Sequence, residues 1–195
     1  VYTNVHIIDY DGTDALQDHP ASMEDFSWRS VAWHKKEVKD MMEAGIDIML
    51  PVYWGSASEK YWSVEGLKVL VQALDELTAE GIEVPKVGMF FDTTALQQDA
   101  GGRIDLTADK GKAIFYRMIR DFYSLIPARF RAEIDGKPIV WLFVADYAIA
   151  YNQDFINFTR EHFREDFNGK DLYIVAERSW NIQADNVYAW GAALN

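Results

Sequence analysis

Two acidic residues each end a run of apolar residues, and their carboxylates are the first candidates for catalysis or ligand binding. Asp92 ends "GMFFD" and Glu177 ends "LYIVAE". A carboxylate is costly to bury unless it is paired, so we expect both side chains to open onto a functional surface. Paired carboxylates act as general acid, general base or nucleophile. In a purely structural alternative, Asp92 caps a turn formed with Thr93 and Thr94, and Glu177 pairs with Arg178 or another base.

Aromatic side chains occur at comparable positions along the chain. Tyr53 and Trp54 follow the apolar run "IDIMLPV", and aromatic residues make up 14% of the sequence. Such rings either fill a core or offer an apolar surface on which a ligand ring stacks. Asp146, which ends "IVWLFVAD", belongs either to the same surface or to a turn that begins the next segment. The predicted ligand-contacting residues are His6, Tyr53, Trp54, Thr93, Asp146, Trp180 and Trp190.

Several other chemistries lack the residues that they need. The chain has no cysteine, no Gly-x-Ser-x-Gly elbow and no glycine-rich phosphate loop. His6, His19 and His34 show no HExxH spacing, and "DYDGTD" lacks the full calcium-loop pattern. His34 lies on the apolar stripe of a predicted helix, so we expect a hydrogen-bonded structural histidine. We therefore predict no metal and no cofactor.

The elements that must position these residues alternate along the chain. Strands are predicted at 1–8, 46–55, 84–94, 137–146, 171–177 and 186–193. Helices are predicted at 30–45, 63–81, 107–127 and 152–166, with Ser63 as an N-cap and glycines ending the first two. This alternation predicts a parallel sheet. Continuous apolar runs such as "IVWLFVA" are typical of strands covered on both faces.

Two parallel architectures compete. A doubly wound sheet should carry a nucleotide-type phosphate turn after its first strand, and none is found. A (β/α)8 TIM barrel gathers functional residues at the carboxyl ends of its strands, and five predicted strands here end in polar or aromatic residues. We therefore predict a barrel. Such a barrel needs eight strands and typically ~250 residues, so we expect residues 1–195 to be a single barrel domain truncated at the C-terminal end, with about six strand–helix units. An open six-stranded sheet is the alternative.

The charge balance narrows the choice of partners. The chain has 31 acidic and 19 basic residues and a net charge of −12. That field repels nucleic acid and anionic membrane surfaces, so neither is an expected partner. No apolar run approaches the ~20 residues that span a bilayer. Nothing in the sequence fixes an oligomeric state, and a monomer is assumed.

Three segments carry a resemblance to a known group of enzymes. They are "SWRSVAWHKKEVKDMMEAGIDIMLPVYWG", "VPKVGMFFDTTAL" and "RFRAEIDGKPIVWLF", and together they cover roughly residues 28–145. These segments resemble the glycoside hydrolase family 99-like barrels, which include endo-α-mannosidases and the related family 71 α-1,3-glucanases. The shared pattern is a helix ending in "AGID", a strand ending in "WG" and a "GKPIV" strand start. "FFDTTAL" is most similar to an uncharacterised secreted bacterial branch.

The resemblance implies a TIM barrel that hydrolyses or binds glycans at its C-terminal mouth, and a secreted or periplasmic protein. It also implies catalytic glutamates in a late "WNEW-E"-like segment. The nearest segment here is "SWNIQAD" at 179–185, where Trp180 and Asn181 have no following glutamate. The principal catalytic glutamate is therefore expected beyond residue 195.

Three functions follow in order of preference. The first is a glycoside hydrolase acting on a polysaccharide or glycan, in which Tyr53 and Trp54 wall the substrate and Asp92 and Glu177 bind hydroxyls or serve as a fallback catalytic pair. The second is a non-catalytic carbohydrate-binding barrel. The third, an α/β protein binding a phosphorylated ligand, is disfavoured by the net charge of −12 and the missing phosphate loop.

Overall fold

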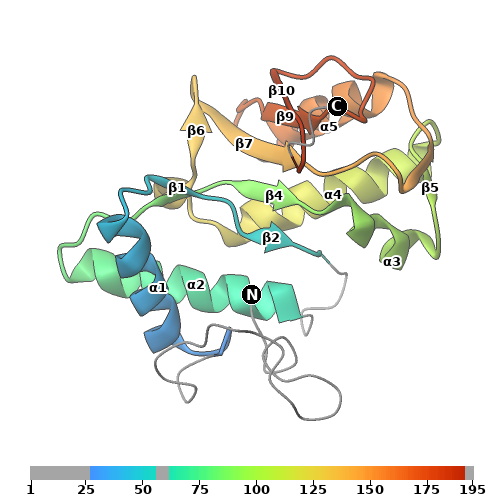
Figure 1. The fold of residues 1–195 in the computed structure, drawn as a ribbon. Helices are drawn as coiled ribbons and strands as arrows, with labels where there is room; N and C mark the ends of the chain where they lie inside the picture. Colours follow the sequence, from blue (N-terminus) through green and yellow to red (C-terminus); the bar gives the residue numbers. More distant parts are fainter. Residues whose placement is uncertain (1–26, 56–61, 192–195) are drawn as a thin grey trace, which may run out of the picture.

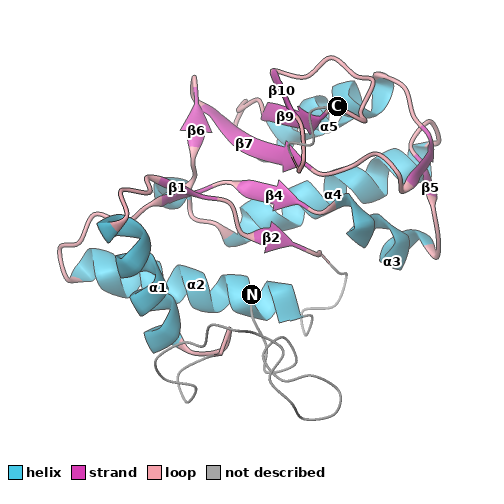
Figure 2. Cartoon of the chain, viewed as in Figure 1, coloured by secondary structure: helices cyan, strands magenta, loops and turns pink. Residues whose placement is uncertain are grey.

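The computed structural model describes residues 27–55 and 62–191 (Figures 1 and 2). The predicted strand 1–8, with His6, and His19 lie outside these residues. The main sheet consists of parallel strands in the order β10-β9-β7-β4-β2. Its members are β2 (Val52–Tyr53), β4 (Met89–Phe91), β7 (Lys137–Leu142), β9 (Tyr173–Glu177) and β10 (Asn186–Tyr188). The predicted parallel α/β arrangement is thus confirmed.

Two short strands extend the sheet at one end. β1 (Ile48–Met49) pairs in parallel with β3 (Lys86–Val87) and leads into β2, as β3 leads into β4. The ladder continues between the two pairs, because Gly88 N donates to Met49 O at 3.0 Å and Phe90 N donates to Pro51 O at 3.3 Å. The single strand predicted at 46–55 is interrupted at Pro51, which has no N–H to donate.

Three further strands were not predicted. β6 (Glu133–Ile134) forms an antiparallel hairpin with β7 through Asp135 and Gly136, both at positive φ. β5 (Ile104–Asp105) and β8 (Ala148–Ala150) form a separate parallel pair. These strands have two or three residues each, too few for a side-chain alternation to show in the sequence.

The predicted helices are all present, and one more is added. They are α1 (Val31–Glu43), α2 (Trp62–Ala79), α4 (Asp109–Leu125) and α5 (Asp154–Asp166), with the short α3 (Leu96–Ala100) between β4 and β5. In Figure 1, α2, α4 and α5 lie on one side of the strands, and α1 packs on α2. Ser63 is not the N-cap of α2, which begins one residue earlier; its hydroxyl instead donates to Trp54 O at 2.8 Å.

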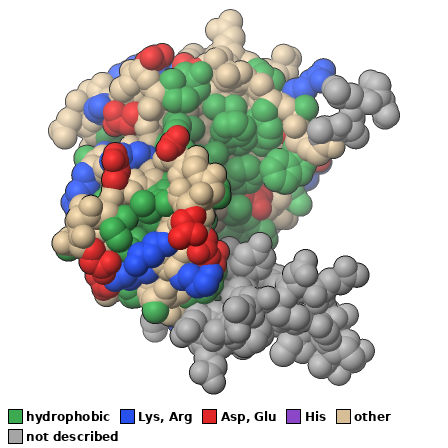
Figure 3. Space-filling view, turned by 60° about the vertical axis from the view of Figure 1, so that its left-hand side comes forward, with side chains coloured by type: hydrophobic (Ala, Val, Ile, Leu, Met, Phe, Trp, Pro, Cys, Tyr) green, Lys and Arg blue, Asp and Glu red, His purple; other side chains and the backbone are tan. Residues whose placement is uncertain are grey.

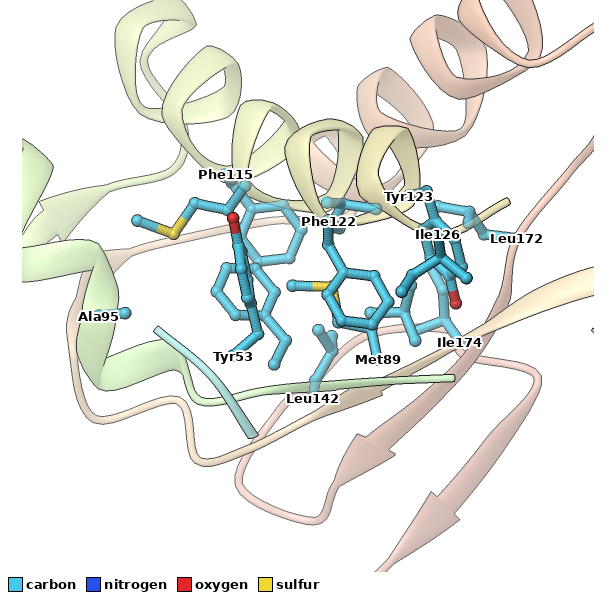
Figure 4. Packing of buried hydrophobic residues seen from close by; sticks show 14 of the residues in the cluster. Tyr53, Met89, Ala95, Phe115, Phe122, Tyr123, Ile126, Leu142, Leu172 and Ile174 are labelled. Atoms are coloured by element: carbon cyan, nitrogen blue, oxygen red, sulfur yellow. The ribbon is translucent and has the colours of Figure 1, made fainter. Parts of the chain in front are cut away.

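The order of the sheet strands follows the order of the chain without a reversal. A doubly wound sheet would instead show a point where the strand order reverses. The core fills the space between the sheet and its helices. Figure 4 shows Phe115, Phe122 and Tyr123 of α4 packed toward Met89 and Leu142 of the sheet, all fully buried. This one core holds the strands in a common orientation, so their carboxyl ends meet at the same edge.

His34 is a structural histidine, as predicted. Its side chain is buried, and Nε2 lies 3.0 Å from the carbonyl oxygen of Trp28. Burial lowers the pKa of the imidazole more than the hydrogen bond to Trp28 raises it. The neutral ring therefore anchors the start of α1 and has no role in the site below.

Two helical glycines should respond in opposite directions to substitution by alanine. A Cβ at Gly66 would lie 3.7 Å from the Trp28 side chain, an ordinary contact, so Gly66→Ala should stabilise the protein by about 0.5–1 kcal/mol through helix propensity. A Cβ at Gly111 would lie 1.9 Å from the carbonyl oxygen of Asp105, so Gly111→Ala should destabilise it by about 1–3 kcal/mol. Urea denaturation of both variants tests the contrast, and a Gly111→Ala variant as stable as Gly66→Ala would contradict it.

Within the residues that the structure describes, no helix is both long and apolar enough to cross a bilayer.

Candidate functional site

Among the described residues, helices cover one face of the main sheet, and no helix covers the other, which we call the open face. Side chains alternate between the faces along each strand. Val52, Phe90, Trp141 and Val175 stand in register across β2, β4, β7 and β9 on the open face. Val52 is 44% exposed, and Phe90 and Trp141 are half-buried. Figure 3 shows a broad area of hydrophobic side chains at the surface of the molecule.

The next row of the open face carries the predicted chemical groups. Across the strands, Tyr53 pairs with Phe91, Phe91 with Leu142, and Leu142 with Ala176. One residue further on stand Trp54, Asp92, Phe143 and Glu177, and Glu177 is in turn paired with Tyr188 of β10. The register therefore brings Trp54, Asp92 and Glu177 to one edge of the sheet.

Five aromatic residues form a patch beside these carboxylates, and we call it the aromatic patch: Phe90, Trp141, Phe143, Tyr188 and Trp190. The Trp190 ring lies 5.1 Å from the Phe143 ring and 5.7 Å from the Phe90 ring, centroid to centroid. Trp141 and Tyr188 form a second contact at 4.8 Å. Trp190 is 60% exposed. The patch thus presents one large indole to solvent on a support of packed rings.

Glu177 ends β9 and is 9% exposed. Its Oε2 accepts a hydrogen bond from Ser179 N at 2.7 Å. Burial alone would raise the pKa of this carboxyl, but hydrogen bonds from Ser179 and from the backbone N–H groups of Trp190 and Arg178 outweigh it and hold the pKa below its ordinary value. Among the described residues no cation forms an ion pair with Glu177. The structural alternative, an ion pair with the exposed Arg178 side chain, is not formed in the described part of the chain.

Asp92 makes two hydrogen bonds at the end of β4. Its Oδ1 accepts from Thr94 N at 3.0 Å and so caps the 3-10 turn Thr93–Ala95. Its Oδ2 accepts from the indole N–H of Trp54. The Trp54 ring is half-buried and lies 6.2 Å from the ring of Trp62. The capping alternative is therefore correct for one oxygen of Asp92, and the other fixes the orientation of Trp54.

Three predicted ligand-contacting residues instead point into the core. Tyr53 is 2% exposed, and its ring packs on the core. Thr93 is 1% exposed and donates its hydroxyl proton to Val144 O. Trp180 is 5% exposed and donates its indole N–H to Phe143 O. These side chains offer no free ring face or hydroxyl at the surface, and we leave them out of the proposed site.

Asp146 is exposed in the loop that follows β7. This loop is tied to the one after β9, because Ala145 N donates to Ser179 Oγ at 2.9 Å. Asp146 therefore lies at the same edge of the sheet as Glu177. His6, the remaining predicted contact residue, falls outside the described residues.

Sequence reasoning missed most of the aromatic patch. Phe90 stands two residues before Asp92, and Trp141 stands two before Phe143. Residues two apart on a strand share a face, so counting back in twos from Asp92 would have placed Phe90 beside it. The same count from Trp190 finds Tyr188. In the described part of the chain, no group of three or more histidine, aspartate or glutamate side chains could hold a metal ion.

Comparison with known proteins identifies a family and a fold. Residues 15–195 match the family model described as "Domain of unknown function (DUF5010)". No curated protein matches the chain. A solved structure named "Glycoside hydrolase-like protein" superposes with a TM-score of 0.60 at 18% sequence identity, over 78% of this chain and 45% of that one. The chain thus spans less than half the length of that structure. The superposition supports the mixed α/β fold with a parallel sheet, but it does not single out glycoside hydrolase family 99. Because the family model covers nearly the whole sequence, the chain belongs to the DUF5010 family.

Proposed function

We propose that this chain is part of a glycoside hydrolase-like protein that binds and hydrolyses a glycan on the open face of its sheet. The observation that carries the proposal is the 60% exposed Trp190 ring of the aromatic patch, which stands at the same edge of the sheet as the buried Glu177 carboxylate. A ring of this kind stacks on the apolar face of a sugar, and a carboxylate beside it binds hydroxyls or attacks the anomeric centre. The fold of the glycoside hydrolase-like neighbour supports the same class of ligand.

The topology supports a partial barrel as the frame of this site. Consecutive parallel strands pair in chain order, and their helices lie on one side of the sheet (Figure 1). Right-handed crossovers that never reverse direction roll a sheet toward closure. In a closed barrel the open face is the inner wall, and the edge with Asp92 and Glu177 is the C-terminal mouth where barrel enzymes place their sites.

The two carboxylates take different roles in this proposal. Glu177 is held ionised and suits a nucleophile, a general base or an acceptor for a sugar hydroxyl. Asp92 uses both oxygens within the protein and positions Trp54. Asp92 and Glu177 flank Phe143, so two inter-strand spacings of about 4.8 Å separate their backbones. The distance between the two carboxyl groups would decide the stereochemical outcome, because about 5–5.5 Å is typical of retaining pairs and about 6.5–9.5 Å of inverting pairs.

A specific observation favours glycan binding without hydrolysis as the second candidate. Hydrolysis needs a group that donates a proton to the leaving oxygen. The pKa of Glu177 is lowered, which makes it a poor proton donor, and Asp92 accepts hydrogen bonds at both oxygens. The proton donor of the hydrolase would have to come from another residue. A chain without one would bind and release the glycan unchanged.

Replacing Trp190 by alanine should weaken glycan binding by about fivefold to thirtyfold, because an exposed stacking ring contributes about 1–2 kcal/mol. A panel of α-mannan and α-glucan oligosaccharides, followed by isothermal titration calorimetry and by release of reducing ends, measures binding and hydrolysis separately.

Ile149→Ala provides the control for that substitution. Ile149 is 62% exposed and lies on β8, outside the aromatic patch. Equal losses in the two variants would place the glycan elsewhere. The proposal fails if the wild-type protein binds no glycan, neutral or charged.

A further inference from the structure

The open face carries the negative charge of Glu177, and no cation of the described residues forms an ion pair with it. Glu177 is ionised and nine-tenths buried, and among the described residues it has no lysine, arginine or histidine partner. Its Oε2 accepts a hydrogen bond from the backbone N–H of Ser179 at 2.7 Å. This N–H stabilises the carboxylate, but it brings no full positive charge to the face.

The side chains beside Glu177 on the open face are aromatic. Phe143 and Tyr188 stand beside it in register, and Trp190 lies against Phe143. Burial and the nearby charge of Glu177 raise the pKa of Tyr188 to about 12, so its phenol is neutral. Aromatic faces attract cations through the ring quadrupole, more strongly when the cation is partly desolvated. A carboxylate next to such rings therefore favours an organic cation over a neutral group.

The remaining charges at this edge of the sheet point the same way. Asp92 and Asp146 add acidic groups at the ends of β4 and β7. Arg178 is the one basic residue that directly follows a strand of the main sheet in the described chain, and its side chain is exposed and forms no ion pair with a described residue. The net charge of −12 adds a long-range attraction for cations and repulsion of anions. The edge is complementary to a positively charged sugar and repels an acidic one.

We infer that the open face selects glycans bearing protonated amines, such as oligomers of unacetylated amino sugars, over N-acetylated or uronic-acid counterparts. This inference rests on the proposed function, because it names the class of glycan that the same site takes. The ammonium group would lie against Glu177, and the adjoining sugar ring would stack on Trp190.

Matched oligosaccharides test the inference directly. A β-1,4-linked glucosamine oligomer, its fully N-acetylated form and an oligogalacturonate of the same length are titrated calorimetrically into the protein, at low salt and a pH where the amines are protonated. The amine form should bind about fivefold to tenfold more tightly than the acetylated form, and the preference should shrink as salt rises. The oligogalacturonate should bind most weakly.

Three variants separate a specific site from attraction to an acidic protein. Glu177→Gln should remove the preference for the amine form, whereas Glu161→Gln, which removes an exposed charge on α5, should leave it intact. Trp190→Ala should weaken both forms together. A preference that survives Glu177→Gln, or an acetylated form that binds as tightly as the amine form, overturns the inference.

The outcomes also distinguish this inference from the proposed function. If neutral glycans bind in a Trp190-dependent way without charge discrimination, only the inference fails. If no glycan of any charge binds, both fail.

Discussion

Replacing Glu177 by glutamine is expected to lower kcat/KM on the hydrolysed glycan by about 10²-fold to 10⁴-fold, the range typical of a missing acid–base or nucleophilic group. Glutamine keeps the size of the side chain and one accepting oxygen, but it removes the negative charge. The loss should fall mainly on kcat. Trp190→Ala should instead raise KM, because stacking on the sugar contributes to binding the ground state and the transition state alike.

The pH dependence of the same reaction follows from the sign of the shift. The pKa of Glu177 lies below the ordinary glutamate value of 4.5, so the ionised form persists as the pH falls through that value. The acidic limb of kcat/KM should therefore lie below about pH 4.5. The free energy of unfolding should depend on pH in the same direction. The stabilisation from ionised Glu177 is fully present above pH 4.5 and is lost as the pH falls through the lowered pKa.

Steady-state kinetics of the wild-type, Glu177→Gln and Glu161→Gln proteins provide the measurement. Glu161→Gln should behave like the wild type, since that carboxylate is exposed on α5. A Glu177→Gln protein with wild-type kcat would exclude a catalytic role and leave the binding role. An acidic limb well above pH 5 would assign the essential base to another residue.

Local patterns in the sequence were enough to predict the order of the main-sheet strands and of the four long helices. The apolar period of α4 and the uninterrupted run of β7 each lie within one segment. The capping role of Asp92 is also local, because the acceptor and Thr94 N are two residues apart. Each of these features depends on neighbours in the chain, which a single sequence displays.

The directions of the aromatic rings could not be predicted in this way. Tyr53 and Trp54 are adjacent, so the pleat sends one to the core and the other to the open face. Which one enters the core is decided by Phe122 of α4, whose ring meets Tyr53 at 5.3 Å from a distant part of the chain. Trp180 is likewise held in the core by a distant contact, because its indole N–H donates to Phe143 O, 37 residues away in sequence. Long-range packing of this kind leaves no local signal.

The environment of Glu177 depends on both kinds of contact. Ser179 N is a local donor, but Trp190 N is brought to the carboxylate by the parallel pairing of β9 with β10. The sequence therefore indicated a carboxylate at a strand end, but not that it would be held ionised. That state separates a base or nucleophile from a proton donor, and it depends on the position of β10.

A partly buried ion-pair network holds β9 and β10 in place, and its loss should cost more stability than the loss of an exposed ion pair. Arg160 of α5 donates to Asp171 at 3.1 Å and to Leu172 O at 2.8 Å, and it also pairs with Asp185. Asp185 in turn accepts from Ile174 N at 2.8 Å, next to the start of β9. One guanidinium thus links α5 to the segments that lead into both strands.

Arg160→Leu should destabilise the protein by about 2 kcal/mol, because Asp171 and Asp185 lose the guanidinium that they share and keep only Arg164 and Lys137 as cationic partners. The side chains of Arg160, Asp171 and Asp185 are only 16%, 22% and 18% exposed. Arg164→Leu is the matched control: Arg164 is 48% exposed and pairs with Asp171 alone, so its loss should cost less than about 1 kcal/mol. Urea denaturation at neutral pH compares the two, and equal losses would contradict a special role for Arg160.

The pH dependence of that difference identifies its cause. Burial alone would raise the pKa values of Asp171 and Asp185, but backbone N–H groups and arginine partners outweigh it and hold both below 3.8. Their stabilising effect is present above that pH and is lost as the pH falls through the lowered values. The gap between wild type and Arg160→Leu should therefore narrow below about pH 3.8. The network should also affect glycan binding, because β9 ends in Glu177 and β10 ends two residues before Trp190. Folded Arg160→Leu protein should therefore bind glycan more weakly than the wild type. A variant that loses stability yet binds at full strength would show that these strand ends are held in place without the network.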